Sequence, residues 1–514
     1  MNILDIINQI YNFINTGELI KAEKACLSML EEYPDNPEIM GILGLVYFQL
    51  GNDNLAQYFL SKSLIIKPDN AFLLHNLGMT FLKKGDIDNA IISFQKALQL
   101  NQNLAYSCHA LGLSYDIKGE YSEALKWYEK AIKIDSNIAD AHNNIGIILQ
   151  KMGKYPEAIS SFKKALEINP KYAEVYSNMG LAYREYGLID NSIEYYRKSL
   201  EINPELIDVH VNLALSLLLN GDYLTGWEEY EWRKKQLPKI FSKPFWESYD
   251  DDVSGKKILI YTEQGFGDAI QFIRYIPFVY ELGAKIILIC PKELKSLFQN
   301  IQGIYNILTF GEKIPDFDLH CPILSLPYIF KTTIENIPSN IPYLFPDKTI
   351  INKWAEKIHS DNNNKLKIGI AWSGRNHVHN INLFAPLSDI NEVTFFSLQK
   401  GEAASQALNP PNGMKIIDYS DQITDFLDTA GIIMNLDLVI SIDTSVAHLA
   451  GALGKNVWTL LTYVPDWRWL LNRKDSPWYP TMRLFRQKSI GNWNSVFSKV
   501  LNELNIIIRK NSFE

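Results

Sequence analysis

The sequence predicts a chain in two parts, an α-helical solenoid of repeats followed by an α/β domain whose two halves face a cleft. The first observation is a glycine that recurs every 34 residues without insertion or deletion, at Gly17, Gly51, Gly85, Gly119, Gly153, Gly187 and Gly221. The second is that this period stops near Pro238, and the third is that short apolar runs alternate with helical segments after it. A fixed period of this length indicates a solenoid. The alternation indicates βαβ units and a parallel sheet.

Each repeat is predicted to be a pair of helices joined by a turn. The periodic glycine suits a turn that needs a positive φ, and the proline that follows it by 17 residues, as at Pro68 and Pro170, ends the second helix. Small residues that let the two helices approach closely keep the same phase, among them Gly78, Gly112, Gly146, Ala90, Ala124 and Ala158. This pattern resembles the tetratricopeptide repeat (TPR), with about seven 34-residue repeats over residues 1–238. Aromatic residues at helical spacing, such as Phe94 and Phe162, are predicted to be core.

One position on the first helix of several repeats carries asparagine, at Asn76, Asn144, Asn178 and Asn212. The first helices of such a solenoid line a concave groove. Carboxamides there can pair with the N–H and C=O groups of an extended peptide without reading its sequence. The series resembles the asparagine ladder in the repeat domain of O-GlcNAc transferases. We therefore expect a groove that binds a peptide; the alternative is that asparagine is simply common at this position of the repeat.

Composition excludes several classes of protein. The 514 residues carry a net charge of −8, which argues against a general nucleic-acid-binding role. The cysteines have no paired spacing, so neither a disulfide framework nor a structural zinc site is expected; they are Cys26, Cys108, Cys290 and Cys321. The start lacks the basic flank of a signal peptide, and no apolar stretch is long enough to span a bilayer. We therefore expect a cytoplasmic protein without a transmembrane segment.

The second part reads as a connector at residues 239–255, an N-terminal half at 256–360, and a C-terminal half at 361–514 that closes with a helix. Strands are predicted at 257–262, 285–290 and 317–321 in the first half, and at 366–372, 393–398, 415–418, 436–441 and 456–461 in the second. Helices are predicted from just after Asp268 to about 282, from about 423 to 434 and from 445 to 453. These are two Rossmann-like halves, and ligands of such sheets bind beyond the carboxyl ends of the strands.

Two motifs resemble the heptosyltransferase-like enzymes of glycosyltransferase family 9. They are Glu263-Gln-Gly-Phe-Gly-Asp-Ala-Ile270 and Ser441-Ile-Asp-Thr-Ser-Val-Ala-His-Leu-Ala-Gly-Ala-Leu-Gly454. Segments around residues 226–233, 425–431, 464–469 and 476–480 further resemble a subgroup of that family fused to TPRs. The resemblance covers most of residues 256–500. It implies the GT-B fold and an inverting transfer of a sugar from a nucleotide-sugar donor, with no metal and no other cofactor.

The predicted donor site centres on Asp443, Thr444 and Ser445, which follow a strand and open a helix. Free backbone N–H groups and the positive end of the helix suit the donor diphosphate, whose charge grows as it leaves. The resemblance also places His448 in contact with the donor. Asp443 is alternatively a helix cap, and a lone helical histidine is more often structural.

Asp268 is the predicted general base, because inversion needs a carboxylate to deprotonate the acceptor hydroxyl and the resemblance assigns this role to that aspartate. Gly265 and Gly267 let the backbone approach the substrate, and Glu263 is the reserve base. The alternative for Asp268 is an acidic residue in the first turn of a helix.

Further candidates border the donor. Ser373 ends a strand next to the nucleotide, and Lys400 at another strand end can neutralise a phosphate or be an ordinary solvated lysine. Trp467, Arg468 and Trp469 can shape the donor pocket, although tryptophan is more often core. Relatives carry a basic loop after Ser373, whereas this chain has Arg375-Asn-His-Val-His-Asn-Ile-Asn-Leu-Phe384. This departure leaves donor identity and activity open.

The leading hypothesis is a cytoplasmic glycosyltransferase that modifies a protein held by its repeats. Flagellin or another surface protein is the acceptor expected by analogy with repeat-fused transferases. The alternatives are a lipid-linked or saccharide acceptor, a non-catalytic TPR scaffold with a degenerate GT-B domain, and a nucleotide-sugar epimerase. The sugar, the acceptor and the oligomeric state are not determined by the sequence.

Overall fold

The computed structural model describes residues 3–238, 240–359, 365–374, 380–411 and 413–511. The chain forms two compact units. The repeat unit comprises Met1–Tyr183 and Glu201–Pro204, and the sheet unit comprises Arg184–Leu200 and Glu205–Glu514.

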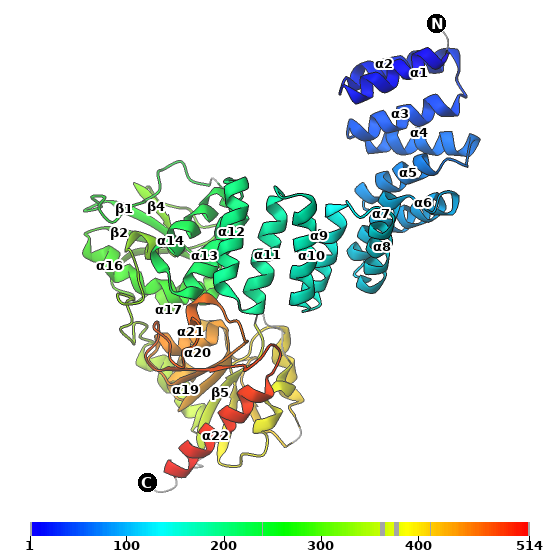
Figure 1. The fold of residues 1–514 in the computed structure, drawn as a ribbon. Coiled ribbons are helices and arrows are strands. Elements are labelled where there is room, and N and C mark those ends of the chain that lie inside the picture. Colours follow the sequence, from blue (N-terminus) through cyan, green and yellow to red (C-terminus); the bar gives the residue numbers. More distant parts are fainter. Residues whose placement is uncertain (1–2, 239, 360–364, 375–379, 412, 512–514) are drawn as a thin grey trace. The chain divides into compact units, whose positions relative to one another are not determined.

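The repeat unit consists of helix pairs that follow one another along the chain, as the sequence predicts (Figure 1). The helices are α1 (Ile3–Asn15), α2 (Leu19–Glu32), α3 (Pro37–Gln49), α4 (Asp53–Ile66), α5 (Ala71–Lys83), α6 (Ile87–Leu100), α7 (Ala105–Ile117), α8 (Tyr121–Ile134), α9 (Ala139–Lys151), α10 (Tyr155–Ile168) and most of α11 (Ala173–Tyr186).

The periodic glycines occupy turns that need a positive φ, as the sequence predicts. The seven periodic glycines all have a positive φ, between 73° and 92°, a region that other residues adopt only at a cost. The second set of small residues packs against a ring of the same repeat: a Cβ on Gly78 would lie 2.6 Å from Phe94, and one on Gly146 would lie 2.5 Å from Phe162. Both rings are fully buried, which confirms them as core.

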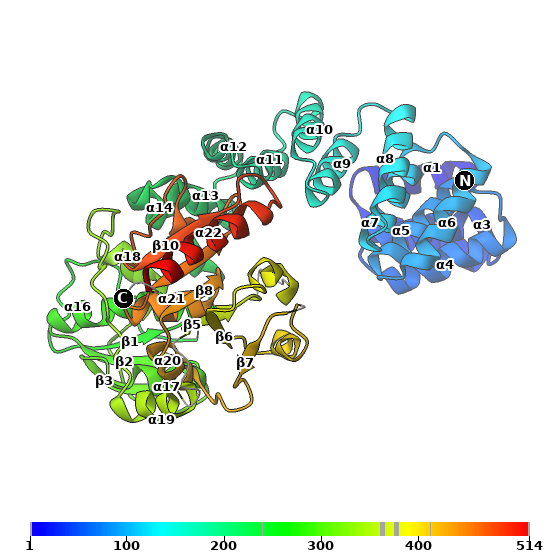
Figure 2. The same ribbon diagram turned by 90° about the horizontal axis from the view of Figure 1, so that it is seen from below.

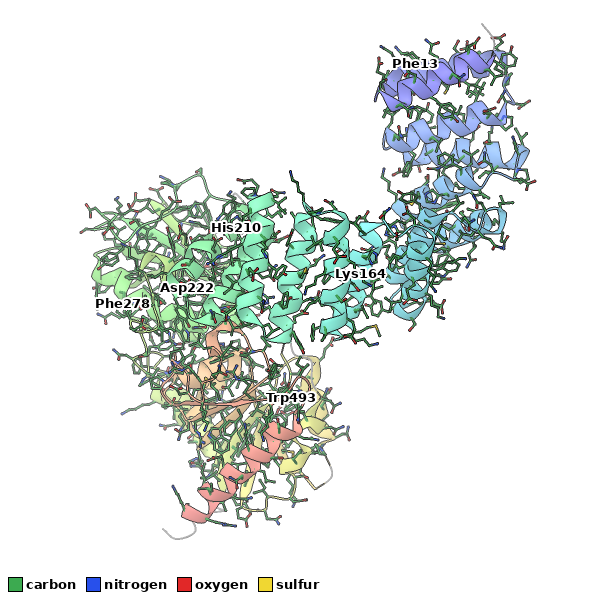
Figure 3. All side chains as sticks on the ribbon, viewed as in Figure 1. Phe13, Lys164, His210, Asp222, Phe278 and Trp493 are labelled. Atoms are coloured by element: carbon green, nitrogen blue, oxygen red, sulfur yellow. The ribbon has the colours of Figure 1, made fainter. Side chains whose placement is uncertain are left out.

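The sheet unit begins with the last helices of the repeat pattern and continues into two parallel sheets. Its first helices are α12 (Ile189–Ile202), α13 (Ile207–Asn220) and α14 (Tyr223–Tyr230), followed by the 3-10 helix η1 (Glu231–Gln236). Asp222 caps α14 by accepting from the Thr225 N–H, and it is labelled in Figure 3 with His210 of α13.

The four-stranded sheet has the order β3-β2-β1-β4, and the six-stranded sheet has the order β10-β9-β8-β5-β6-β7. The first is formed by β1 (Lys257–Tyr261), β2 (Lys285–Cys290), β3 (Ile304–Thr309) and β4 (Leu319–Pro322). The second is formed by β5 (Leu366–Ala371), β6 (Val393–Ser397), β7 (Ile416–Asp418), β8 (Leu438–Ile442), β9 (Val457–Leu461) and β10 (Met482–Arg486). Every paired register in both sheets is parallel, so the α/β prediction holds.

Helices cover both sheets, and they are α15 (Phe266–Phe272), α16 (Ile276–Glu281), α17 (Lys292–Phe298), α18 (Leu326–Ile329), α19 (Lys348–Ile358), α20 (Phe426–Met434), α21 (Ser445–Ala452) and α22 (Asn494–Asn511). Figure 2 shows α22 beside the six-stranded sheet, where Phe497 and Leu504 join a core with Ile370 and Ile440 of the strands. The predicted C-terminal helix therefore closes the larger sheet.

The structure differs from the predicted domain limits in two places. The repeat pattern does end near residue 238, but its last helices pack as part of the sheet unit. The segment predicted as a connector is packed rather than free, since Trp246 is buried and its backbone N–H donates to the carbonyl of His320 in β4. The predicted limit between the two halves, at residues 360 and 361, lies outside the described residues.

Candidate functional site

The loop after β1 brings the predicted acceptor residues to the start of α15. Gly265 caps this helix, and its N–H donates to Oδ2 of Asp268 at 3.0 Å. A Cβ on Gly267 would lie 3.0 Å from Cδ2 of His448, so glycine allows α15 to pack closely against α21. Asp268 is therefore a capping residue in the first turn, one of the roles considered from the sequence, and it also lines the cleft described below.

Arg468 is the partner of Asp268. Its guanidinium donates to Oδ1 of Asp268, to Oδ1 of Asp466 at 2.8 Å, and to Oε1 of Gln271 at 2.6 Å. Asp268 comes from the four-stranded half and Arg468 from the loop after β9, so this ion pair joins the two halves of the sheet unit. The sequence placed Arg468 at the donor pocket but gave no sign of this partner, which lies 200 residues away.

Glu263 is held by a residue of the repeat pattern. Its Oε1 accepts from Nη2 of Arg233 in η1 at 2.9 Å, whereas Oε2 is enclosed and has no hydrogen-bond partner among the described residues. Burial raises the pKa of this carboxyl to about 7, against the opposing effect of Arg233. The Glu263 side chain is only 6% exposed, compared with 19% for Asp268. Of the two candidate bases, Asp268 is the one that an acceptor can reach more readily.

The predicted donor residues sit where β8 leads into α21. Thr444, not Asp443, is the N-cap, and its hydroxyl accepts from the N–H of Val446. Burial raises the pKa of Asp443, and Asp466 adds to this rise. His448 is buried, which lowers its pKa well below the usual value, so this imidazole is neutral. Its Nδ1 is 2.9 Å from the hydroxyl of Tyr479, and its Nε2 is 3.9 Å from Oδ1 of Asp443.

The remaining donor candidates follow β5 and β6. Gln399 ties the two strand ends together, because its Oε1 accepts from the Ser373 N–H and its Nε2 donates to the Ser373 carbonyl. The ammonium of Lys400 donates to the carbonyls of Ser420 and Ile423, at 2.6 and 3.0 Å. Lys400 thus holds a neighbouring loop while the residue itself stays exposed. Arg375, His377 and His379 of the altered loop lie outside the described residues.

One cleft of about 1290 Å³ gathers the candidates of the sheet unit. Its lining includes Arg468 but neither Trp467 nor Trp469. It also includes ten further candidates, namely Glu263, Gly265, Gly267, Asp268, Ser373, Lys400, Asp443, Thr444, Ser445 and His448. These residues follow the carboxyl ends of β1, β5, β6 and β8, where ligands of parallel sheets bind.

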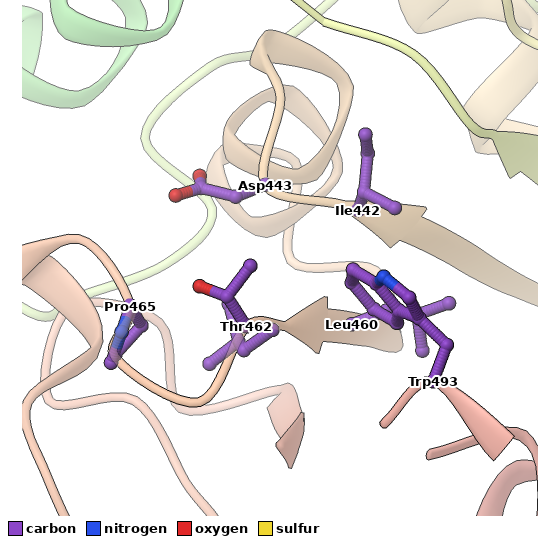
Figure 4. Close-up of a pocket in the computed structure, with 7 residues that line it drawn as sticks. Ile442, Asp443, Leu460, Thr462, Pro465 and Trp493 are labelled. Atoms are coloured by element: carbon purple, nitrogen blue, oxygen red, sulfur yellow. The ribbon is translucent and has the colours of Figure 1, made fainter. Parts of the chain in front are cut away.

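A second pocket lies behind Asp443 and is far smaller. Figure 4 shows it between Ile442, Leu460, Thr462 and Trp493, with the carboxylate of Asp443 directed away from Trp493. Its volume of about 10 Å³ is close to that of a single water. A nucleotide therefore fits only the larger of these two cavities.

The four asparagines of the predicted peptide groove all have partners within the protein. Nδ2 of Asn144 is 3.1 Å from Nε2 of His109 and 3.3 Å from the hydroxyl of Tyr128. Nδ2 of Asn178 donates to Asn143, and Nδ2 of Asn76 donates to the carbonyl of Phe72. In the sheet unit, Oδ1 of Asn212 accepts from Arg184. A peptide that used these amides would have to compete with existing bonds.

Neither a metal centre nor a membrane-spanning helix is present among the described residues. No group of three or more His, Cys, Asp or Glu is placed to hold a metal ion in the described parts of the chain. No described helix combines the length and the apolar character needed to cross a bilayer. Independence from metal remains a prediction.

Models of known protein families match the repeats of this chain. The family model described as tetratricopeptide repeat matches residues 71–104, 139–172 and 173–206, and a second TPR model matches residues 117–153. The N-terminal part of the chain is a tetratricopeptide repeat array. TPRs are protein–protein interaction modules, and the array therefore points to a protein partner.

Among curated proteins, Protein FlbA of Caulobacter vibrioides is 25% identical over 325 residues, which are 56% of this chain and 53% of that protein. The chain thus spans about half the length of this relative. Among solved structures, MamA is 29% identical over 32% of this chain and 95% of its own, with a TM-score of 0.30. A TPR protein from Parabacteroides merdae is 17% identical over 46% of this chain and 93% of its own, with a TM-score of 0.38.

Proposed function

We propose that the chain is a nucleotide-sugar-dependent glycosyltransferase with a GT-B domain, and that its acceptor is a protein recruited by the TPR array. The observation that carries the proposal is one cleft at the carboxyl ends of two parallel sheets, lined by ten residues predicted for donor and acceptor chemistry. The resemblance to family 9 glycosyltransferases supports the same assignment.

In this proposal the donor diphosphate lies at the start of α21. The backbone N–H groups of the first turn and the hydroxyl of Ser445 face the charge that develops on the leaving group. Neutral His448 offers Nε2 on the same wall when the hydroxyl of Tyr479 donates to Nδ1. Asp268 accepts the proton of the acceptor hydroxyl as this oxygen attacks the anomeric carbon and the bond to the diphosphate breaks.

A non-catalytic scaffold is the second candidate, and two contacts favour it. Arg468 holds Asp268, the proposed base, and Lys400 is committed to backbone carbonyls. In this alternative the sheet unit only supports a partner that the repeats recruit.

The experiment is a thermal-shift screen of the full chain against ADP, GDP, UDP, CMP and their common sugars, followed by transfer of the labelled sugar from the nucleotide that binds. A ligand that binds only the folded state raises Tm. Label in the protein fraction supports the proposal, and label in the lipid or saccharide fraction changes the acceptor class. Absence of both nucleotide binding and transfer supports the scaffold.

Two sets of variants assign the roles. We expect Asp268→Ala to retain donor binding and to lose transfer by about 100-fold or more, as for loss of a general base. Full transfer by this variant would remove Asp268 from the mechanism. Joint replacement of Asn144, Asn178 and Asn212 by alanine is expected to weaken acceptor binding without changing nucleotide affinity. Unchanged acceptor affinity would discard the asparagine ladder.

A further inference from the structure

Arg468 has unused hydrogen-bonding capacity inside the cleft. A guanidinium has five N–H donors, and the side-chain bonds of Arg468 go to Asp268, Asp466 and Gln271 through Nη2, Nη1 and Nε respectively. One N–H on each terminal nitrogen is therefore left for another acceptor. Although only 10% of the side chain is exposed, Arg468 lines the cleft.

The other groups that could meet an anion are less suitable. Among the described lining residues the cations are Lys400 and Arg468, and the ammonium of Lys400 is bound to two carbonyls. His448 is neutral because burial lowers its pKa. Of the two described cations that line the cleft, Arg468 is therefore the one whose terminal nitrogens can donate to a ligand.

Arg468 also lies close to the proposed seat of the diphosphate. Its charge acts on both Asp443 and His448, which flank the start of α21. Gly267, next to Asp268, packs within reach of His448 and Ser445. An anion at the first turn of α21 would therefore face the guanidinium that holds Asp268.

We propose that Arg468 has two partners in turn, Asp268 in the free protein and the donor diphosphate in the complex. This inference rests on the proposed function and adds to it an order of binding. A diphosphate that draws Nη2 away from Asp268 leaves Oδ1 of that carboxylate free to accept a proton. The base becomes competent only after the donor has bound, so the nucleotide sugar binds before the acceptor is deprotonated.

The test uses inorganic pyrophosphate as the probe, titrated into the full chain by calorimetry with a chelator present and at fixed low salt. Charge-assisted bonds to phosphate contribute about 1.5–3 kcal/mol each, so Arg468→Gln is expected to weaken pyrophosphate binding about tenfold or more. Asp268→Asn is expected to tighten binding, because a neutral amide oxygen holds Nη2 less strongly than a carboxylate and a competing charge is removed. The double variant of Arg468→Gln and Asp268→Asn should bind pyrophosphate no more tightly than Arg468→Gln alone. Because it removes both charges of the pair, it also provides the measurement if Arg468→Gln alone unfolds.

Glu293→Gln is the matched control, because it removes one carboxylate from the same cleft at a residue that does not bond to Arg468. Equal tightening by Glu293→Gln and Asp268→Asn would overturn the proposal in favour of a general charge effect. Unchanged affinity in Arg468→Gln, or no binding of pyrophosphate by the natural chain, would overturn it as well. Pyrophosphate binding through Arg468 without any sugar transfer would support this inference and reject the proposed function. Sugar transfer by the natural chain, together with normal pyrophosphate binding by Arg468→Gln, would support the proposed function and reject this inference.

Discussion

At the scale of single residues, the sheet unit is organised by two buried arginines, which hold one carboxylate in the loop after β1 and one in the first turn of α15. Arg233 binds Glu263 and Arg468 binds Asp268. The two carboxylates differ in what remains free: Asp268 is bonded through both oxygens, whereas Oε2 of Glu263 has no described partner. Removal of the arginine from such a buried pair is costly, because it leaves the carboxylate charge uncompensated.

Glu263 should make the stability of the sheet unit depend on pH. Its pKa is raised to about 7 in the folded state, whereas in the unfolded chain it is about 4.3. Between these values the folded state keeps a proton that the unfolded state has lost, so stability falls as the pH rises through this window and is constant above it. We expect Glu263→Gln, which keeps an acceptor for Arg233, to remove a slope of about 1.4 kcal/mol per pH unit.

The measurement is Tm as a function of pH for the natural chain and the variant. The two should agree at the acid end of the window, and Glu263→Gln should be the more stable above pH 7. Parallel curves across the whole window would show that Glu263 titrates normally.

The residues of the candidate site were predictable as a set, but their pairing was not. Motifs after strands located Asp268, Asp443 and His448, because parallel sheets place such loops at one edge. The bond between Asp268 and Arg468 joins positions 200 apart, and no local pattern encodes a contact of that range. For the same reason the sequence did not reveal that Arg233 holds Glu263.

At the scale of elements, the strands with apolar runs were predicted closely, and β2 was predicted with its observed bounds. β3 and β10 were missed. Both are edge strands of their sheets, and they read as Ile-Tyr-Asn-Ile-Leu-Thr and Met-Arg-Leu-Phe-Arg, with polar residues that interrupt the apolar run. The repeat helices were the most predictable elements, since one fixed period sets both the turn and the close contact.

A repeat helix should tolerate alanine poorly at its small-residue position. Gly146→Ala would place Cβ 2.5 Å from the ring of Phe162, and we expect a loss of about 1–3 kcal/mol from overpacking. Gly153→Ala meets no atom within 4 Å but has a φ of 73°, so its cost of about 1–2 kcal/mol comes from the backbone.

Chemical denaturation with a second substitution separates these causes. Phe162→Leu should recover part of the stability lost in Gly146→Ala and none of that lost in Gly153→Ala. Equal recovery in both backgrounds would contradict the packing explanation.

At the scale of the whole molecule, the end of the repeat pattern and the boundary between compact units do not coincide. Trp227 of α14 packs with Trp467 and Phe272 and donates to the carbonyl of Thr332, while Gln264 donates to the hydroxyl of Tyr230. The last repeat therefore supports both loops that carry Asp268 and Arg468.

We expect Arg233→Met to destabilise the sheet unit by about 3–5 kcal/mol, because it leaves Glu263 and Glu231 without their shared cation. Hydrogen exchange read by mass spectrometry should show α13, α14 and β1 losing protection together while α3 to α10 keep theirs. Lys235→Met, a change at a half-exposed lysine of the same 3-10 helix, should cost no more than about 0.5 kcal/mol. Loss of protection throughout the repeat unit in Arg233→Met would contradict this division.

The packing of α14 has a practical consequence for grafting. An engineer who joins the two sheets to a different recognition array would naturally cut where the 34-residue period ends, near Pro238. That cut would remove Tyr223, Trp227 and Arg233 and expose an apolar surface beside the cleft. A fusion in which the sheet unit begins at Arg184 keeps these side chains. The part of this protein that can be moved as a unit therefore includes its last repeat.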